Sequence, residues 1–343
     1  MNWSSISLCL YLACATALNV KHGNVSTTET RVFVVVLGHG EETRSQGLSA
    51  TLHSFYEQLG PENFDCLVFV WNPDMRLPDV PPGCEIKVTP GVFMEYTALI
   101  PEDRLQAARY AYLMADDVTL DVPNILNYSS MDIAALRDVA AENCVDAITP
   151  AHYGSDRNDV LYGVMKSKQH KRPGVVGRLL FFLEFQGVLV SPIIVHLLSR
   201  LASAGITGCW GYDSLLYSAT KKWTGRLPRI GIADNMEINV GKKSLSSPER
   251  ITDNPCGKVA RDKNGNIVHV SATDQIDHWL YKSGLVDYKA RQVTSIGDLK
   301  GAPPGRTKQK AECSRLLAPG DLSLLGRPAE FAAWLHAVVD FGP

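Results

Sequence analysis

The sequence lacks the short motifs that mark several common enzyme classes. It contains no P-loop, no His-Glu-x-x-His pattern and no Gly-x-Ser-x-Gly elbow, which disfavours the usual forms of NTPase, zinc protease and α/β-hydrolase. Gly38-His39-Gly40 is followed by Thr43 where a dinucleotide fingerprint needs glycine, so a typical NAD site is disfavoured too. The expected first strand ends without an Asp, which argues against aspartyl-phosphate chemistry.

The chain also lacks a strong excess of charge. Its 343 residues carry a formal net charge of −2, which argues against a nucleic-acid partner and gives no electrostatic attraction to anionic membranes. Any ligand must therefore be recognised by local groups. The length leaves room for one large domain or two small ones, and the 45% of hydrophobic residues is enough for a sizeable core.

Long hydrophobic runs are missing as well. The apolar run over residues 6–20 has about 15 residues, whereas a membrane span needs about 20. Ala15-Thr16-Ala17 fits the small-x-small rule for cleavage, so we predict a signal peptide over residues 1–17. The mature chain would then have no transmembrane span, and would reside in the secretory pathway (the ER or Golgi lumen) or be secreted. A short uncleaved anchor is the alternative.

Cysteines are few, and none of those in the mature chain has the spacing of metal ligands. Of the eight cysteines, cleavage would remove Cys9 and Cys14 and leave six. An even count in a secretory compartment permits disulfides, but sequence does not fix their pairing. For Cys66 and Cys144, which lie in or beside strand-like runs, we expect buried thiols.

Apolar runs alternate with helical patterns from residue 31 to about residue 240. We expect strands over residues 31–37, 66–71, 85–89 and 146–149, another along the run after Ala108, and a last short strand over 229–233 ending at Asp234. This alternation predicts an α/β domain over residues 31–240, with a mainly parallel sheet and helices on both faces. Residues 241–343 would form a small α+β appendage, with a hairpin around Asn264-Gly265 and a closing helix.

Two adjacent carboxylates, Asp116 and Asp117, follow the apolar run after Ala108. They would lie at the carboxyl end of a buried strand, where open α/β sheets bind their ligands. Neighbouring acids repel each other unless a cation or hydrogen-bond donors hold them. A divalent metal carrying a phosphate-bearing ligand would use them well. In the alternative, Asp117 caps a turn and Asp116 faces water.

Three further acids, Glu184, Asp213 and Asp234, lie near expected strand ends. Asp213 follows Trp210 and Gly211, and an aromatic ring beside a carboxylate suits sugar binding. The alternative makes Trp210 a core residue and Asp213 a helix N-cap, and the spacing does not decide between them. The polar, basic segment over residues 154–178 is typical of a solvated loop, or of a loop that clamps a phosphate.

Four of these stretches together resemble a family of plant, algal and bacterial proteins, the domain-of-unknown-function family seven hundred and seven. That family is itself similar to glycosyltransferases of the GT-A fold. The resemblance covers roughly residues 31–240 and depends on the segments Tyr110–Val118, Phe182–Ser191, Trp210–Asp213 and Ile230–Asp234.

The resemblance implies a GT-A-like (Rossmann-like) glycosyltransferase. It would move a sugar from a nucleotide-sugar donor to a glycan or another hydroxyl acceptor, with Mn²⁺ or Mg²⁺ as cofactor. Asp117 would bind the metal, and Asp116 the metal or the ribose. The family pattern looks like Asp-x-Asp, and its first acid falls on Ala115 here.

The resemblance also implies roles for the remaining candidates. Asp213 would be the catalytic base that activates the acceptor hydroxyl, and Glu184 a catalytic residue that contacts the donor or acceptor sugar. Trp210, Gly211 and Asp234 would bind substrate.

Two alternatives stay open. One is a lumenal carbohydrate- or nucleotide-binding protein that has the fold without turnover, which the loss at Ala115 favours. The other is a lumenal hydrolase with paired carboxylates, which the lack of a second, separated acid pair disfavours.

Overall fold

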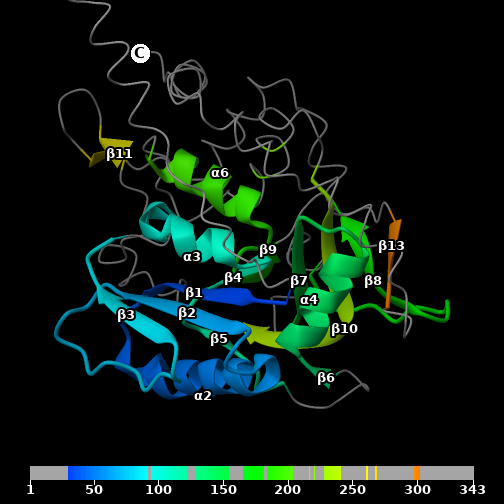
Figure 1. Ribbon diagram of the computed structural model, residues 1–343, viewed down its shortest axis with the longest axis horizontal. Helices are drawn as coiled ribbons and strands as arrows, with labels where there is room; N and C mark the ends of the chain where they lie inside the picture. The colour runs from blue at the N-terminus through cyan, green and yellow to red at the C-terminus, as the bar shows by residue number, and fades with distance from the viewer. Residues whose placement is uncertain are drawn as a thin grey trace, which may run out of the picture.

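The computed structural model describes residues 30–91, 94–122, 129–153, 165–180, 184–203 and 228–240, with Leu216, Thr220 and the short segments 260–261, 267–268 and 297–301. The architecture is mixed α/β, with one central sheet between two layers of helices (Figure 1). No helix in this part of the chain is long and apolar enough to cross a membrane. The predicted signal peptide lies outside the described residues.

The first four main strands form a parallel half-sheet in the order β3-β2-β1-β4. They are β1 (Val32–His39), β2 (Phe64–Val70), β3 (Cys84–Val88) and β4 (Tyr110–Met114). Residues 32–36 of β1 are completely buried and alternate between two cores, with Val34 in one and Val35 in the other. This explains the continuously apolar, β-branched sequence, because a central parallel strand is covered on both faces.

The other half of the sheet is mixed. Its strands are β5 (Val118–Thr119), β6 (Ser129–Ser130), β7 (Ala147–Tyr153), β8 (Val175–Leu180), β9 (Gly187–Val190), β10 (Ile230–Val240) and β13 (Gly297–Lys300). Strand β9 runs antiparallel to its neighbours β4 and β7, and β8 runs antiparallel to β10 and β13. Strands β7 and β10 are parallel and share the direction of β1 to β4. The prediction of a mainly parallel sheet is therefore confirmed.

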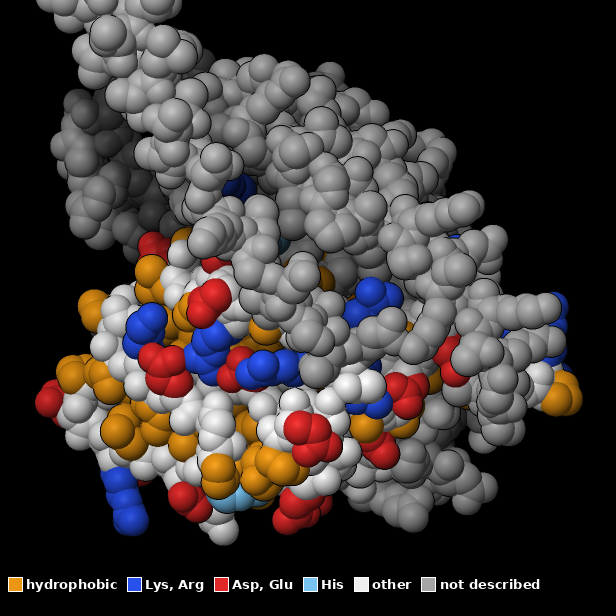
Figure 2. Space-filling view, in the orientation of Figure 1, with side chains coloured by type: hydrophobic (Ala, Val, Ile, Leu, Met, Phe, Trp, Pro, Cys, Tyr) orange, Lys and Arg blue, Asp and Glu red, His pale blue; other side chains and the backbone are white. Residues whose placement is uncertain are grey.

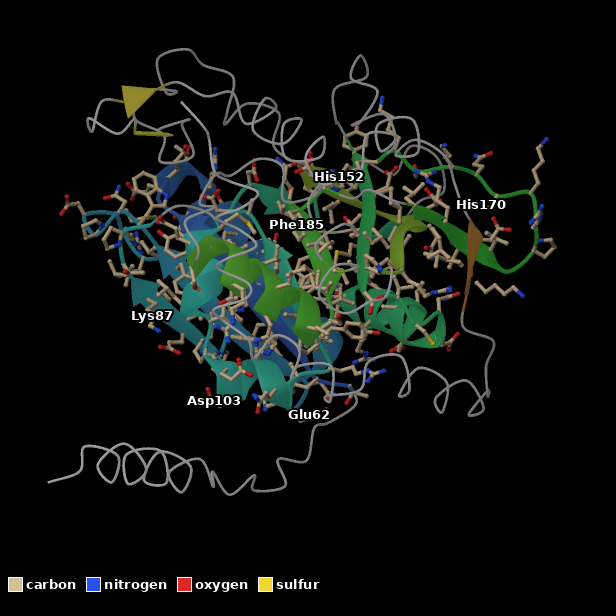
Figure 3. All side chains as sticks on the ribbon, turned by 90° about the horizontal axis from the view of Figure 1, so that it is seen from above. Glu62, Lys87, Asp103, His152, His170 and Phe185 are labelled. Carbon is tan, nitrogen blue, oxygen red and sulfur yellow. A yellow bond between two sulfur atoms is a disulfide. The ribbon has the colours of Figure 1, made fainter. Side chains whose placement is uncertain are left out.

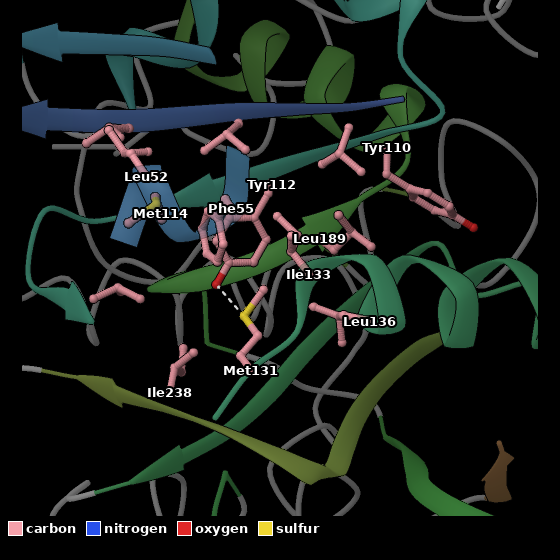
Figure 4. Packing of buried hydrophobic residues seen from close by; sticks show 14 of the residues in the cluster. Leu52, Phe55, Tyr110, Tyr112, Met114, Met131, Ile133, Leu136, Leu189 and Ile238 are labelled. Carbon is pink, nitrogen blue, oxygen red and sulfur yellow. Dashed lines mark hydrogen bonds between the residues drawn. The ribbon is translucent and has the colours of Figure 1, made fainter. Parts of the chain in front are cut away.

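Helices cover both faces, as the sequence predicts. Helices α2 (Glu42–Leu59) and α4 (Ile133–Glu142) pack on one face, and η1 (Glu95–Leu99), α3 (Glu102–Ala107) and α6 (Pro192–Ser203) pack on the other. Figure 1 shows α2 on one side of the sheet and α3 with α6 on the opposite side. In the α2 core, the Phe55 ring meets Tyr112 of β4 edge-on, at 5.3 Å between centroids, and the Tyr112 hydroxyl reaches the Met131 sulfur (Figure 4).

The last predicted strand is longer than expected. Strand β10 does not stop at Asp234 but runs to Val240. Its pairing with β7 shifts between Ala233 and Glu237, which is a bulge. Asp234, which the sequence pattern placed at the end of the strand, lies within this bulge.

The expectation of buried thiols is wrong. Cys66 and Cys84 form a disulfide, and Cys144 is disulfide-bonded as well. The register of the parallel pair places Cys66 of β2 opposite Cys84 of β3, so the two side chains meet.

The C-terminal region is described only in short pieces. Strands β11 (Ala260–Arg261) and β12 (Ile267–Val268) pair antiparallel, as the hairpin prediction requires. Strand β13 pairs with β8 in the main sheet. The boundary at residue 240 stays a prediction, and the expected closing helix lies outside the described residues.

Candidate functional site

The strand order defines where a ligand crevice would form. From β1 the chain builds β2 and β3 on one side, then returns to place β4 on the other side of β1. Open α/β sheets bind ligands outside the carboxyl ends of their strands, at such a reversal of order. His39 ends β1, and Asp116 lies two residues beyond the end of β4. The predicted acid pair therefore lies where this rule places a ligand.

Asp116 is buried and held at both carboxylate oxygens. Its Oδ2 lies 3.0 Å from Nδ1 of His39, and its Oδ1 accepts a hydrogen bond of 2.6 Å from Nη1 of Arg44. The His39 side chain is completely buried, and Arg44 also reaches Glu41 at 3.3 Å. The repulsion between the adjacent acids is thus offset by the Arg44 guanidinium and the His39 imidazole, which both contact Asp116.

The charges around Arg44 fix its ionisation. Burial alone would lower the pKa of the guanidinium, but the neighbouring Asp116, Asp117 and Glu41 carboxylates raise that pKa above its usual value on balance. Arg44 is therefore a permanent cation at this edge of the sheet. Hydrogen bonds between ionised partners are roughly twice as strong as neutral ones, so the Arg44–Asp116 contact holds the carboxylate in place.

The ring of His39 also contacts a hydroxyl. Its Nε2 lies 3.0 Å from Oγ of Ser45, a partly buried residue in the first turn of α2. His39 thus bridges Ser45 and Asp116.

Trp71 is a neighbour of this cluster that the sequence reasoning missed. It follows β2, its backbone N–H donates to the carbonyl oxygen of His39 at 2.9 Å, and 38% of the residue is exposed. A Cβ atom built on Gly40 would lie only 1.9 Å from the indole ring, so the ring rests directly on the Gly40 backbone. The available signal was a Trp at the carboxyl end of a predicted strand.

Glu184 and Asp117 lie at the same edge. Glu184 is buried and precedes β9, whose first residue, Gly187, pairs with the last residue of β4. One further backbone hydrogen bond, from Ala115 N to Gln186 O at 3.4 Å, continues this contact beyond the strands. Asp117 is partly buried. The structure therefore brings Glu184 to the edge that holds Asp116 and Asp117.

Asp234 belongs to a different cluster. It is buried in the β10 bulge and contacts Arg178 Nη1 at 3.0 Å and His170 Nε2 at 2.7 Å, and it accepts a 3.0 Å hydrogen bond from the Lys168 backbone N–H. Burial raises the pKa of the Asp234 carboxyl, and these three partners oppose the rise. In Figure 3, His170 lies beside β8 and β13, across the molecule from Lys87 of β3.

Asp234 thus anchors part of the polar, basic segment over residues 154–178, through its contacts with Lys168, His170 and Arg178. Its predicted role in substrate binding stays a prediction. Three other predicted site residues, Trp210, Gly211 and Asp213, lie outside the described residues. Their roles therefore stay predictions.

The described residues do not by themselves complete a metal site at the acid pair. Within the described ranges, no group of three or more His, Cys, Asp or Glu side chains is placed to hold a metal ion. Each oxygen of Asp116 already accepts one hydrogen bond, from His39 or from Arg44, so a metal there would share the carboxylate with these two side chains. Metal binding at Asp117 stays a prediction.

On the face shown in Figure 2, acidic and basic side chains are interspersed.

Fold and site together define a mixed α/β protein with a polar cluster at the reversal of its strand order. Comparisons add little to this. No known family model matches the chain, and no curated protein matches it, so the family resemblance remains a prediction. One solved structure that it resembles is described as "a glycosyltransferase involved in the glycosylation of the major capsid of PBCV-1". The identity is 9%, the match covers 62% of this chain and 94% of that one, and the TM-score is 0.34, a level that carries no argument.

Proposed function

We propose that the protein is a GT-A-like glycosyltransferase that binds a nucleotide-sugar donor at the carboxyl ends of β1, β2 and β4. The observation that carries the proposal is the position of the acid pair. Asp116 contacts the His39 side chain, and the His39 carbonyl oxygen accepts a hydrogen bond from the Trp71 backbone N–H. The acid pair and Trp71 therefore follow neighbouring strands at the edge of the sheet where α/β folds take up nucleotides.

Each group at this edge suits one part of such a donor. The indole of Trp71 offers a flat apolar surface for a base or a sugar ring, and stacking of a base on an aromatic ring is worth about 1–3 kcal/mol. Arg44 supplies a fixed positive charge beside the predicted position of the diphosphate. Glu184, at the same edge, would contact the sugar.

The reaction would proceed mainly through positioning of the donor against an acceptor hydroxyl. Asp213 is the proposed base for that hydroxyl, since a positioned carboxylate typically contributes a factor of about 100 to 10,000 in rate. Mn²⁺ or Mg²⁺ dependence stays a separate proposal, because the pairing of Asp116 does not supply a metal site.

Donor binding is tested by thermal shift with a panel of nucleotide sugars, each measured with Mn²⁺ and with EDTA. A donor at 100 times its dissociation constant adds about 2.7 kcal/mol of stability. We expect Trp71→Ala to need at least ten times more donor than wild type to reach the same stabilisation. The matched control is Leu77→Ala, since Leu77 is also an exposed apolar side chain, and it should bind donor normally.

Catalysis is tested by sugar release and transfer from the donor that binds. We expect Asp213→Asn to bind the donor normally and to lose about 100-fold or more in transfer. If no nucleotide sugar stabilises the protein, the proposal is wrong. If a donor binds but no sugar is released or transferred, the protein is a nucleotide-sugar-binding protein without turnover.

A further inference from the structure

We propose that Ser45, His39 and Asp116 form a Ser-His-Asp catalytic triad, which gives the protein a carboxylic-ester hydrolase activity independent of the proposed glycosyl transfer. The Ser45 hydroxyl lies 3.0 Å from Nε2 of His39, and Nδ1 of the same ring lies 3.0 Å from Oδ2 of Asp116. Both distances fall within the range of about 2.6–3.2 Å in which a nucleophile, its base and the group that orients the base operate.

The hydrogen-bonding capacity of the partners sets the tautomer of His39. An ionised carboxylate only accepts hydrogen bonds, so Nδ1 carries the proton that is donated to Asp116. In the neutral imidazole, Nε2 is then the nitrogen without a proton, which can accept the hydroxyl proton of Ser45. The second oxygen of Asp116 accepts a hydrogen bond from Arg44, which fixes the orientation of the carboxylate.

The burial of the three side chains also suits this chemistry. His39 is completely buried and Asp116 nearly so, which holds the base and its orienting group in fixed positions. Ser45 is only partly buried on α2, and the proposal requires a substrate to reach its hydroxyl from the exposed side of the residue. The missing Gly-x-Ser-x-Gly motif does not count against the assignment, because triads occur on unrelated folds and in different chain orders.

The start of α2 provides donors for the charge that develops during ester cleavage. In the first turn of α2 the Arg44 N–H already donates to the Glu41 carbonyl oxygen at 3.0 Å, so the N–H groups of Glu42 and Thr43 are the candidate donors. Side chains on a helix lean towards its N-terminus, which directs the Ser45 hydroxyl towards these N–H groups. They would stabilise the oxyanion of a tetrahedral intermediate.

The reaction balances with an ester and water as the only reactants. Ser45 Oγ forms a bond to the carbonyl carbon and transfers its proton to Nε2 of His39. The ester C–O bond then breaks, and the proton passes to the departing alkoxide to give the alcohol. Water, deprotonated by the same nitrogen, releases the carboxylic acid and restores Ser45.

The same contacts would exist if they only satisfied the polar atoms of a buried imidazole. Both roles predict a loss of stability when His39 is replaced. Only the triad makes the Ser45 hydroxyl more nucleophilic than other serine hydroxyls of the chain, so reactivity at that atom decides between the two roles.

The test treats the full chain with a fluorophosphonate probe and locates the modified residue by mass spectrometry, with p-nitrophenyl acetate hydrolysis as a second readout. We expect modification at Ser45, and loss of both signals in Ser45→Ala. The matched control is Ser54→Ala, on the same helix, where the hydroxyl accepts a bond from the Gln58 amide rather than contacting a histidine; it should react like wild type. Asp116→Asn should lower hydrolysis by about 10,000-fold, because the wrong tautomer of the histidine is then favoured.

The outcome is decided on wild-type protein whose circular dichroism shows it folded, so it does not depend on how well any variant folds. The triad is absent if the probe modifies Ser45 of the wild-type protein no faster than Ser54. It is also absent if the wild-type protein hydrolyses the ester no faster than the Ser45→Ala variant. Nucleotide-sugar binding is measured in a separate assay, so a failure here leaves the proposed glycosyl transfer untouched, and the reverse also holds.

Discussion

Acidification should destabilise the fold through one buried histidine, His152 of β7. Burial lowers the pKa of this imidazole from 6.5 to about 3, because the charged form would lose its hydration. Its Nε2 lies 3.3 Å from Oγ1 of Thr149, whose hydroxyl donates to the Gly187 carbonyl oxygen at 2.8 Å. Figure 3 places His152 towards the middle of the sheet. The ring is thus neutral in the folded protein at neutral pH.

The size of the effect follows from the two pKa values. Between pH 6.5 and about pH 3 the unfolded chain binds a proton at this residue and the folded chain does not. Stability therefore rises with pH across this window and is lost as the pH falls through it. Lowering the pH from 7 to about 4.5 crosses about two units of this window, and at about 1.4 kcal/mol per unit it costs about 2–3 kcal/mol.

Urea unfolding of wild type and His152→Gln at both pH values would measure this contribution. The glutamine does not titrate, so we expect wild type to lose about 2–3 kcal/mol more than the variant on acidification. His53→Gln, at a more exposed histidine of α2, is the matched variant for loss of an imidazole outside the core. If His152→Gln loses as much stability as wild type, His152 is not held neutral by burial.

Three other substitutions have defined outcomes. Gly40→Ala would place a Cβ 1.9 Å from the Trp71 ring, so we expect a loss of about 1–3 kcal/mol in thermal unfolding, and an unchanged melting temperature would contradict the close packing of the two residues. Cys66→Ser opens a bridge between cysteines 18 residues apart and should cost about 3 kcal/mol in urea unfolding; equal stability would mean that the bridge does not form. Asp234→Asn leaves the guanidinium of Arg178, which is only 2% exposed, without its buried counter-charge. We expect the free energy of unfolding to fall by about 3–5 kcal/mol. A loss below about 1 kcal/mol would show that the pair is not desolvated.

The sequence was sufficient for the elements whose pattern is local. The apolar run over residues 31–37 predicted β1, because that strand is buried along its length. On α2 the buried residues Leu48, Leu52 and Phe55 have the spacing of one helix face, a pattern that is equally local. The position of Asp116 at a strand end was predicted for the same reason, since an abrupt change from apolar residues to acids marks where a buried strand leaves the core.

The features that the sequence did not reveal depend on contacts between distant segments. The His39–Asp116 hydrogen bond joins residues 77 positions apart and requires β1 and β4 to be neighbours. Pairing of Cys66 with Cys84 requires the register of β2 against β3. Asp234 looked like the end of a strand because a polar residue in a bulge has the same local pattern as one in a loop.

The disulfide between Cys66 and Cys84 has a consequence for how the protein behaves at high concentration. Strand β3 is the outermost described strand on its side of the sheet, so its outer edge presents backbone groups to which another chain could add a strand. It is only five residues long and carries Glu85 and Lys87, two features that discourage such addition. The covalent link to β2 goes further, because β3 cannot detach and exchange with its counterpart in a second molecule while the bridge is intact. Reducing conditions would remove this protection, so strand exchange between copies of the chain should be confined to the reduced protein.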